Sequence, residues 1–97
     1  GDANSAANAI MQAGVGDKVK LAAFDMDETN LQRIQDGTQF FAIDQQPYMQ
    51  GYLAVSLLNG YVQYGLKIPT APILTGPGIV DASNVDATLA GAAAGAR

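Results

Sequence analysis

The chain has 97 residues, a formal net charge of −4, 48% hydrophobic residues and 14% charged residues, which suits one small globular domain. Its five basic residues form no patch that would neutralise phosphates, so we expect no nucleic-acid partner. Because the sequence holds neither cysteine nor histidine, disulfides, thiolate sites, the usual zinc sites and histidine-based catalytic triads are excluded.

The sequence shows neither a membrane-spanning stretch nor a signal peptide. Its first residues, Gly1 and Asp2, look like the end of a strand–helix junction whose strand is missing. We therefore expect the chain to be the C-terminal part of a longer protein.

Hydrophobic periodicity and the positions of glycine and proline predict alternating helices and strands. In chain order, we expect a helix over 2–13, a strand over 18–24, a helix over 27–36, a strand over 39–44, a helix over 47–64 and a short strand over 73–75. Pro69 and Pro72 indicate a linker, 76–78 a turn, and 87–97 a flexible tail. The strand–helix–strand unit from Asp25 to Asp44 predicts two parallel strands.

The helix over 47–64 is apolar around most of its circumference, which is typical of a buried helix. Gly51 and Gly60 lower its intrinsic stability, and we expect them where the helix packs very close to a sheet. Two or three short strands are too few to cover such a helix. The covering surface is therefore expected from the rest of the protein or from another subunit.

Polar residues follow the predicted strands at three points: Asp2, Asp25 and the pair Gln45–Gln46. The carboxyl ends of parallel strands share one edge of a sheet, so these residues are expected to lie together there. Carboxylates accept hydrogen bonds from adjacent hydroxyls, and amides both donate and accept. The set suits a neutral polyol or sugar and does not suit an anion.

Phe24 and Tyr48 adjoin these junctions, and an aromatic ring offers an apolar face to a sugar. Each of the candidates also has a purely structural interpretation. Asp2 and Asp25 are suited to capping the helices that follow them, and Phe24 is suited to a hydrophobic core. For Asp2 and for Phe24 taken alone we prefer the structural interpretation, whereas for Asp25 and Gln45 together the spacing does not choose between the two.

A second motif is the strand followed by D-x-D-x-T at residues 25–29, which resembles the first motif of the haloacid dehalogenase superfamily of phosphatases. That resemblance implies a nucleophile at Asp25, an acid/base at Asp27, phosphoryl binding by Thr29 and a magnesium ion. The superfamily also needs a downstream lysine and a later acidic pair. Lys67 lies in the predicted linker, no acidic pair follows, and Asn30 replaces the usual apolar residue.

A longer resemblance covers Gly1 to about Asp86. The pieces GDANSAANAIMQAG, KVKLAAFDMDETNLQRIQDG, FFAIDQQPYMQGYLAVSLLNGYVQYG and ILTGPGIVDASN follow one another as in the C-terminal part of type I periplasmic sugar-binding proteins. IDQQPYMQGY is the most specific of them. These proteins form the ribose-binding-like group that serves ATP-binding-cassette (ABC) importers. Four ordered matches outweigh one five-residue motif, so the sequence is identified as a member of this group.

The resemblance implies an α/β fold with three-layer parallel-sheet lobes, two in the whole protein and incomplete in this chain. Such proteins hold a sugar between lobes joined by three hinge crossings. The positions matching Asp25 and Gln45 hydrogen-bond the sugar. Relatives often have asparagine where this chain has Gly1, which leaves Asp2 as the nearest polar substitute.

The resemblance divides the chain into four parts: residues 1–45 in the C-terminal lobe, 46–71 in the N-terminal lobe, 72–86 as the closing strand and 87–97 as the tail. It implies binding of a monosaccharide or similar polyol in the periplasm, or by an extracytoplasmic lipoprotein, and delivery to an ABC permease. It implies neither catalysis nor a cofactor. The effector domain of a sugar-responsive repressor has the same fold and stays an alternative.

Overall fold

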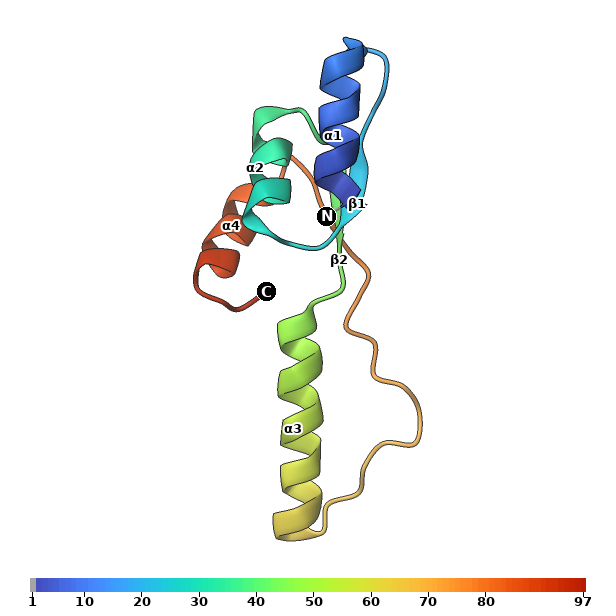
Figure 1. The fold of residues 1–97 in the computed structure, drawn as a ribbon. Coiled ribbons are helices and arrows are strands. Elements are labelled where there is room, and N and C mark those ends of the chain that lie inside the picture. The colour runs from blue at the N-terminus through green and yellow to red at the C-terminus, as the bar shows by residue number, and fades with distance from the viewer. Residues whose placement is uncertain (1) are drawn as a thin grey trace.

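The computed structural model describes residues 2–97, that is, all residues except Gly1. Helices and strands alternate along the described chain (Figure 1) as α1 (Asp2–Ala13), β1 (Ala22–Phe24), α2 (Glu28–Asp36), β2 (Phe41–Asp44), α3 (Pro47–Tyr64), β3 (Gly78–Val80) and α4 (Val85–Ala93). The first three helices confirm the predicted ranges to within one residue at each end. Strands β1 and β2 lie inside their predicted ranges but are shorter.

Local sequence explains where α2 begins and ends. The Asp27 carboxylate oxygen Oδ1 accepts the backbone N–H of Asn30 at 2.8 Å, which caps the helix. Gly37 then ends α2 in the left-handed conformation, with a φ of 84°, which favours glycine. Asp27 therefore fills the capping role that the structural interpretation gave to Asp25.

The three strands form one mixed sheet in the order β1–β2–β3. β1 and β2 run parallel, with Ala23 paired to Ala42, which confirms the prediction from the strand–helix–strand unit. β3 pairs with β2 in the antiparallel direction, with Val80 opposite Ala42. The strand expected over 73–75 is wrong, because this segment has no regular secondary structure and β3 begins at Gly78.

The Gly76–Gly78 segment lies against the end of β2 and does not form the turn predicted there. A Cβ on Gly76 would lie 2.9 Å from the carbonyl oxygen of Asp44. A Cβ on Gly78 would lie 3.7 Å from the Cβ of Asp44. The first distance is too short for a real Cβ, so glycine is needed at Gly76 for the two backbone segments to approach this closely. The second is an ordinary contact, and Gly78 is the first residue of β3.

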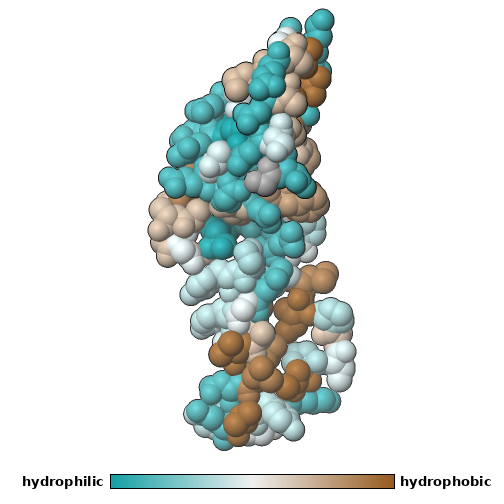
Figure 2. Space-filling model, in the orientation of Figure 1, coloured by the Kyte–Doolittle hydropathy of each residue, from teal (hydrophilic) through white to brown (hydrophobic). Residues whose placement is uncertain are grey.

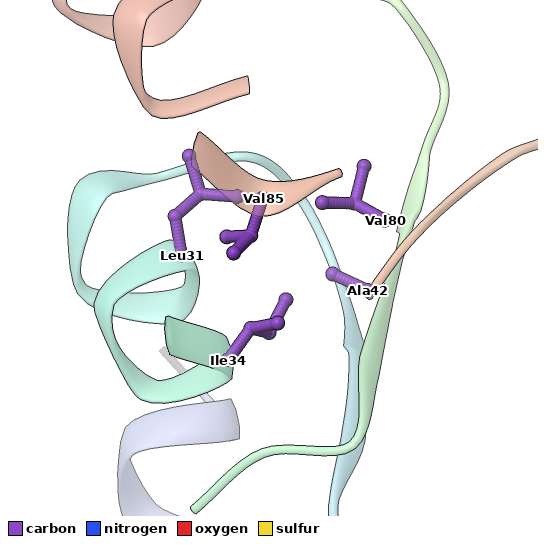
Figure 3. Packing of buried hydrophobic residues seen from close by; sticks show 5 residues of the cluster. All are labelled: Leu31, Ile34, Ala42, Val80 and Val85. Carbon is purple, nitrogen blue, oxygen red and sulfur yellow. The ribbon is translucent and has the colours of Figure 1, made fainter. Parts of the chain in front are cut away.

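One small hydrophobic core holds α2 and α4 against the sheet (Figure 3). Its five buried residues are Leu31 and Ile34 of α2, Ala42 of β2, Val80 of β3 and Val85 of α4. The side chains of Ala42 and Val80 point to the face of the sheet that carries these helices. The core of the described chain is therefore one-sided.

The flexible tail predicted over 87–97 is wrong for most of that range. Helix α4 packs on α2 and buries Val85 and Thr88. Alanine has the highest intrinsic helix propensity, and the buried valine anchors the helix. Beyond α4 the Arg97 side chain turns back, so that its Nη1 lies 3.2 Å from Asp44 Oδ2 and its Nη2 donates to Thr88 Oγ1 at 3.1 Å.

The opposite face of the sheet is left open by the residues that the structure describes. On this face, Phe24 of β1, Ile43 of β2 and Ile79 of β3 are paired neighbours and form one row across the sheet. The side chains of Phe24 and Ile79 are 58% and 52% exposed. Sheets with parallel strands usually carry helices on both faces. The described chain thus has the incomplete α/β architecture that was predicted, with one helical layer and the sheet in place.

Helix α3 and the linker 66–77 project from the sheet, and the molecule measures 59 × 24 × 22 Å (Figure 1). The described chain buries none of the residues of α3. Figure 2 shows hydrophobic side chains gathered over this projecting part, and the exposed ones include Val55, Leu58 and Val62. Among the helices of residues 2–97, none is both long enough and apolar enough to cross a membrane.

The close helix–sheet packing predicted from Gly51 and Gly60 is not found within residues 2–97. A Cβ on Gly51 would have no neighbour within 4 Å. A Cβ on Gly60 would lie 3.2 Å from Leu66 Cδ1, which belongs to the linker and not to the sheet. Because α3 projects from the sheet that these residues form, close packing at the two glycines stays a prediction for the complete protein.

Replacing Leu31 with alanine is expected to lower the free energy of unfolding of the 97-residue chain by about 2–5 kcal/mol. Leu31 is fully buried at the centre of the core, so the change leaves a cavity between α2, α4 and the sheet. Urea unfolding followed by circular dichroism measures the loss. Leu58→Ala on α3 is the matched control, because Leu58 is 57% exposed. Equal effects of the two variants would contradict the observed core.

Candidate functional site

The first candidate residue, Asp25, directly follows β1. Its backbone N–H donates to the carbonyl oxygen of Ile43 at 3.3 Å, which extends the β1–β2 pairing by one residue. Its φ is 78°, a left-handed conformation that residues with a Cβ seldom adopt. The residue is exposed, so its carboxylate faces solvent at the carboxyl edge of the sheet.

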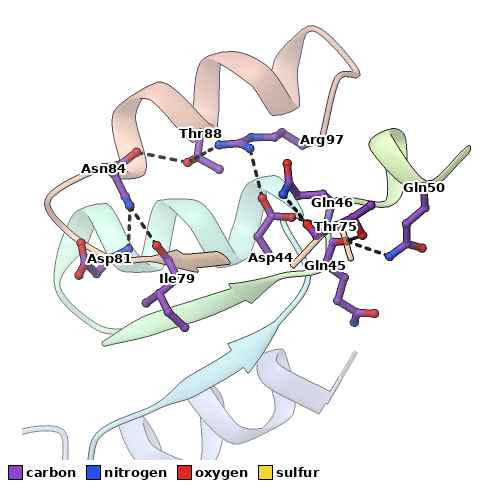
Figure 4. A network of polar contacts seen from close by, with 10 residues as sticks. All are labelled: Asp44, Gln45, Gln46, Gln50, Thr75, Ile79, Asp81, Asn84, Thr88 and Arg97. Atoms are coloured by element: carbon purple, nitrogen blue, oxygen red, sulfur yellow. Dashed lines mark hydrogen bonds and ion pairs between the residues drawn. The ribbon is translucent and has the colours of Figure 1, made fainter. Parts of the chain in front are cut away.

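The second candidate, Gln45, follows β2 and begins the connection to α3. Its carbonyl oxygen accepts hydrogen bonds from Gln50 Nε2 at 2.8 Å and from Thr75 Oγ1 at 3.0 Å. Figure 4 shows the Gln45 side chain pointing away from these contacts. Backbone bonds therefore hold the residue in place and leave its side-chain amide available.

The next residue, Gln46, ties together the two chain segments that leave and re-enter the sheet. Its backbone N–H donates to Asp44 Oδ1 at 2.8 Å, and its side chain donates to the carbonyl oxygen of Thr75. The Asp44 carboxylate is almost fully buried and also pairs with Arg97 (Figure 4). The segments around residues 45 and 75 thus lie side by side, although 30 positions separate them in the sequence.

The structure brings the four predicted ligand-binding residues to one edge of the sheet. A cavity of about 360 Å³ is lined by Asp2, Phe24 and Asp25 together with residues of α1 and Asn30. A second cavity, of about 470 Å³, is lined by Phe24, Gln45, Ile43 and the segment 73–77. Phe24 lines both cavities and is 58% exposed among the described residues, because the face of the sheet that carries it is uncovered there.

Two further residues that the sequence associated with sugar binding do not line these cavities: Tyr48 lies apart from them, and Gly1 is outside the described residues. Tyr48 stacks on Tyr52 in the first turns of α3, with ring centroids 6.3 Å apart and an interplanar angle of 16°. Gly1, which matches an asparagine in relatives, lies outside the described residues. Asp2 belongs to the first turn of α1, where a carboxylate also suits the helix dipole.

The first cavity is lined by the carboxylates of Asp2, Asp25 and Asp27, and the second combines the amides of Gln45 and Gln50 with a mainly apolar wall. Among the described residues, neither cavity is lined by a lysine or an arginine. Carboxylates and amides beside one aromatic ring bind hydroxyl groups and repel phosphate. This arrangement matches the neutral polyol expected from the sequence.

The phosphatase alternative fits the geometry poorly. Asp27, its proposed acid/base, already accepts two hydrogen bonds from Asn30, at 2.8 Å through Oδ1 and 3.1 Å through Oδ2. Within residues 2–97, no group of three acidic side chains is placed to hold a metal ion. The second aspartate of the D-x-D-x-T motif, Asp27, therefore serves as the N-cap of α2.

Sequence reasoning missed three residues that shape this edge: Asn30, Asp44 and Arg97. The only signal for Asn30 was its departure from the apolar residue usual in phosphatases. Asp44 and Arg97 are 53 positions apart and meet only through the packing of α4 on α2. Local pattern carries no information about such a pair.

Comparison with known proteins agrees with this architecture. A sequence model of the family described as "Periplasmic binding protein domain" matches residues 1–67. A carbohydrate transporter from Acidothermus cellulolyticus 11B, solved in complex with myo-inositol, is 40% identical with a TM-score of 0.84, and the match covers 98% of this chain and 33% of that one. A periplasmic ribose ABC transporter from Conexibacter woesei is 27% identical with a TM-score of 0.75, over 96% of this chain and 31% of that one.

A curated relative points the same way. The xylose/arabinose-binding protein XylF of Sulfolobus acidocaldarius is 28% identical over 94 residues, which is 92% of this chain and 23% of XylF. The chain thus spans about a third or less of the length of these relatives, whose names are those of binding and transport proteins and not of enzymes. With a family model matching more than half of its length, the chain belongs to the periplasmic binding protein family.

Proposed function

We propose that this chain supplies part of a sugar-binding cleft in a two-lobed protein that delivers a monosaccharide or similar polyol to an ABC-type importer. The observation that carries the proposal is the common edge shared by Asp25, Phe24 and Gln45, which is lined by carboxylate, amide and aromatic groups without a cation. Asp2 extends the same edge.

The chemistry of each group suits a sugar. The Asp25 carboxylate accepts hydrogen bonds from two neighbouring hydroxyls, and the Gln45 amide both donates and accepts. The exposed ring of Phe24 offers an apolar surface to the C–H face of a sugar ring. Relatives named for binding or holding myo-inositol, ribose, xylose or arabinose support a polyhydroxylated ligand.

In this proposal the chain crosses between the lobes twice, near residue 45 and near residue 75, and these two segments lie side by side. Residues 1–45 belong to one lobe, 46–71 form part of the other, and 72–86 return to the first. Helix α4 and Arg97 pack on the first lobe, since α4 contacts α2 and Arg97 pairs with Asp44. Sugar contacts from both lobes would favour the closed form over the open one.

The remaining partners follow from this role. The relatives are about three times as long as this chain. The apolar surface of α3 packs against the part of the complete protein that this chain does not include. A membrane permease recognises the closed form, and the protein works in the periplasm or as an extracytoplasmic lipoprotein. These statements rest on the family membership and on the uncovered surfaces of α3 and the sheet.

A thermal-shift panel tests the proposal. The complete protein, confirmed by intact mass to contain these 97 residues, is heated with myo-inositol, D-ribose, D-xylose, L-arabinose or glucose 6-phosphate. A neutral member at 100 times its Kd stabilises the protein by about 2.7 kcal/mol, whereas glucose 6-phosphate does not, because the described residues of this chain that line the edge include carboxylates and no cation. Stabilisation by the phosphate alone, or by no member of the panel, would contradict the proposed function.

A further inference from the structure

The backbone of Asp25 has an unfavourable conformation that other contacts must stabilise. Its φ of 78° is left-handed, and Asp25 and Gln46 are the two non-glycine residues of the described chain with positive φ. A Cβ makes this conformation unfavourable, so it persists only where surrounding contacts impose it. Asp25 itself is exposed, and on its two sides the chain is held by the bond from its N–H to the carbonyl oxygen of Ile43 and by Met26, which packs against the core. Neither contact holds the carbonyl oxygens of Phe24 and Asp25, whose orientation sets the angles at Asp25.

Asn30 provides these contacts from the first turn of α2. Its side-chain Nδ2 donates to the carbonyl oxygens of Phe24 at 3.1 Å and of Asp25 at 3.3 Å, and to Asp27 Oδ2 at 3.1 Å. The two carbonyls belong to the peptide planes on either side of the Asp25 Cα. Because the orientation of these planes sets φ and ψ, one amide group holds both backbone angles of Asp25.

The amide of Asn30 is itself held in one orientation. Arg33 Nη2 donates to Asn30 Oδ1, and a guanidinium has no acceptor, so the oxygen faces Arg33 and the NH₂ group faces the loop. Arg33 is anchored in turn by Nη1 to Asn4 Oδ1 at 2.7 Å and by Nε to Gln39 Oε1 at 3.1 Å. Asn30 and Gln39 are each only 2% exposed, so water competes little for these bonds.

We propose that Asn30, oriented by Arg33, is a positioning residue for sugar binding: it holds Asp25 in the left-handed conformation that aims the carboxylate into the cleft. This inference rests on the proposed function. It adds a specific dependence on Asn30: although this residue lines the cavity, it is only 2% exposed and both ends of its amide are engaged within the protein, so it acts through the backbone of Asp25.

Asn30→Asp tests the proposal in the complete protein. The variant keeps the shape of the side chain and an acceptor for Arg33, but it removes both donors to the carbonyls. We expect the Kd of the tightest-binding sugar of the panel, measured by calorimetry, to rise about 10-fold. Gln32→Glu, the same amide-to-carboxylate change on the exposed face of α2, is the matched control and should change the Kd less than about 2-fold.

A double-mutant cycle separates positioning from a general effect on the fold. Asp25→Gly removes the carboxylate and also the need for support, because glycine adopts positive φ freely. In the Asp25→Gly background, Asn30→Asp should therefore change the Kd less than about 2-fold. A loss that is equally large in both backgrounds would overturn the proposal, since Asn30 would then act independently of Asp25.

The other outcomes are also decisive. If Asn30→Asp fails to fold, Arg33→Gln keeps the Asn30 amide but frees its orientation, and its smaller loss, about 3-fold, should likewise vanish in the Asp25→Gly background. Unchanged affinity in Asn30→Asp, while Asp25→Gly weakens binding, overturns only the positioning role. Unchanged affinity in Asp25→Gly overturns the site itself, and an inert panel overturns the proposed function.

Discussion

Asp25→Ala in the complete protein is expected to weaken sugar binding by roughly 10- to 150-fold. A hydrogen bond to a charged group contributes about 1.5–3 kcal/mol, and each 1.4 kcal/mol is a factor of ten in Kd. The exposed Asp25 carboxylate stands at the edge of a cavity that it shares with Phe24 and Asp2. Titration calorimetry with the sugar that gives the largest thermal shift measures the loss.

Two further variants show whether the charge or the backbone is responsible. Asp25→Asn keeps the shape and tolerates the left-handed conformation, so its loss should be smaller than that of alanine. Asp86→Ala removes an exposed carboxylate on α4, whose contact is with Gln35 at 3.0 Å, and should leave the Kd unchanged. If Asp25→Ala behaves like Asp86→Ala, Asp25 is not a sugar ligand.

Hydrogen exchange in α3 is expected to slow by at least about 100-fold between the 97-residue chain and the complete protein. An 18-residue helix without packing is only marginally stable in water. Burying two side chains such as Val55 and Leu58 contributes about 3–6 kcal/mol, and 100-fold protection needs only about 2.7 kcal/mol. Exchange followed by mass spectrometry, with peptides covering Pro47–Tyr64, reads out the difference.

Helix α2 is the internal control for this experiment. It buries Leu31 and Ile34 within the 97-residue chain, so its exchange should differ much less between the two proteins. Equal exchange of α3 in both proteins would show that the rest of the complete protein does not cover this helix. The proposed division at residues 45–46 would then be wrong.

The elements that sequence reasoning predicted well are those whose signals lie close together in the chain. Helix α2 has its cap at Asp27, its apolar stripe at Leu31 and Ile34, and its stop at Gly37, all within eleven residues. The parallel pairing of β1 and β2 followed because the helix between them permits little else. The placement of Asp25 and Gln45 at one edge is a direct consequence of that pairing.

The failures share a different cause. The segment that leads into β3 passes Asp44, more than 30 positions earlier, at a distance that only glycine allows at Gly76. The sequence of α4 looks like that of a flexible tail. The helix is anchored by Val85, which is buried only because it packs into the core between α2 and the sheet. In both cases the deciding contact joins segments that are distant in sequence.

For this protein, the sequence by itself determined the alternation of helices and strands and the two polar junctions, because helix periodicity, caps and glycine stops act over a few residues. Only the tertiary structure decided the antiparallel direction of β3, the docking of α4, the Asp44–Arg97 ion pair and the hydrogen bond from Asn30 to the Asp25 carbonyl. These features depend on side chains that meet after the chain has folded. Their energies come from burial and geometry, which no local pattern in the sequence records.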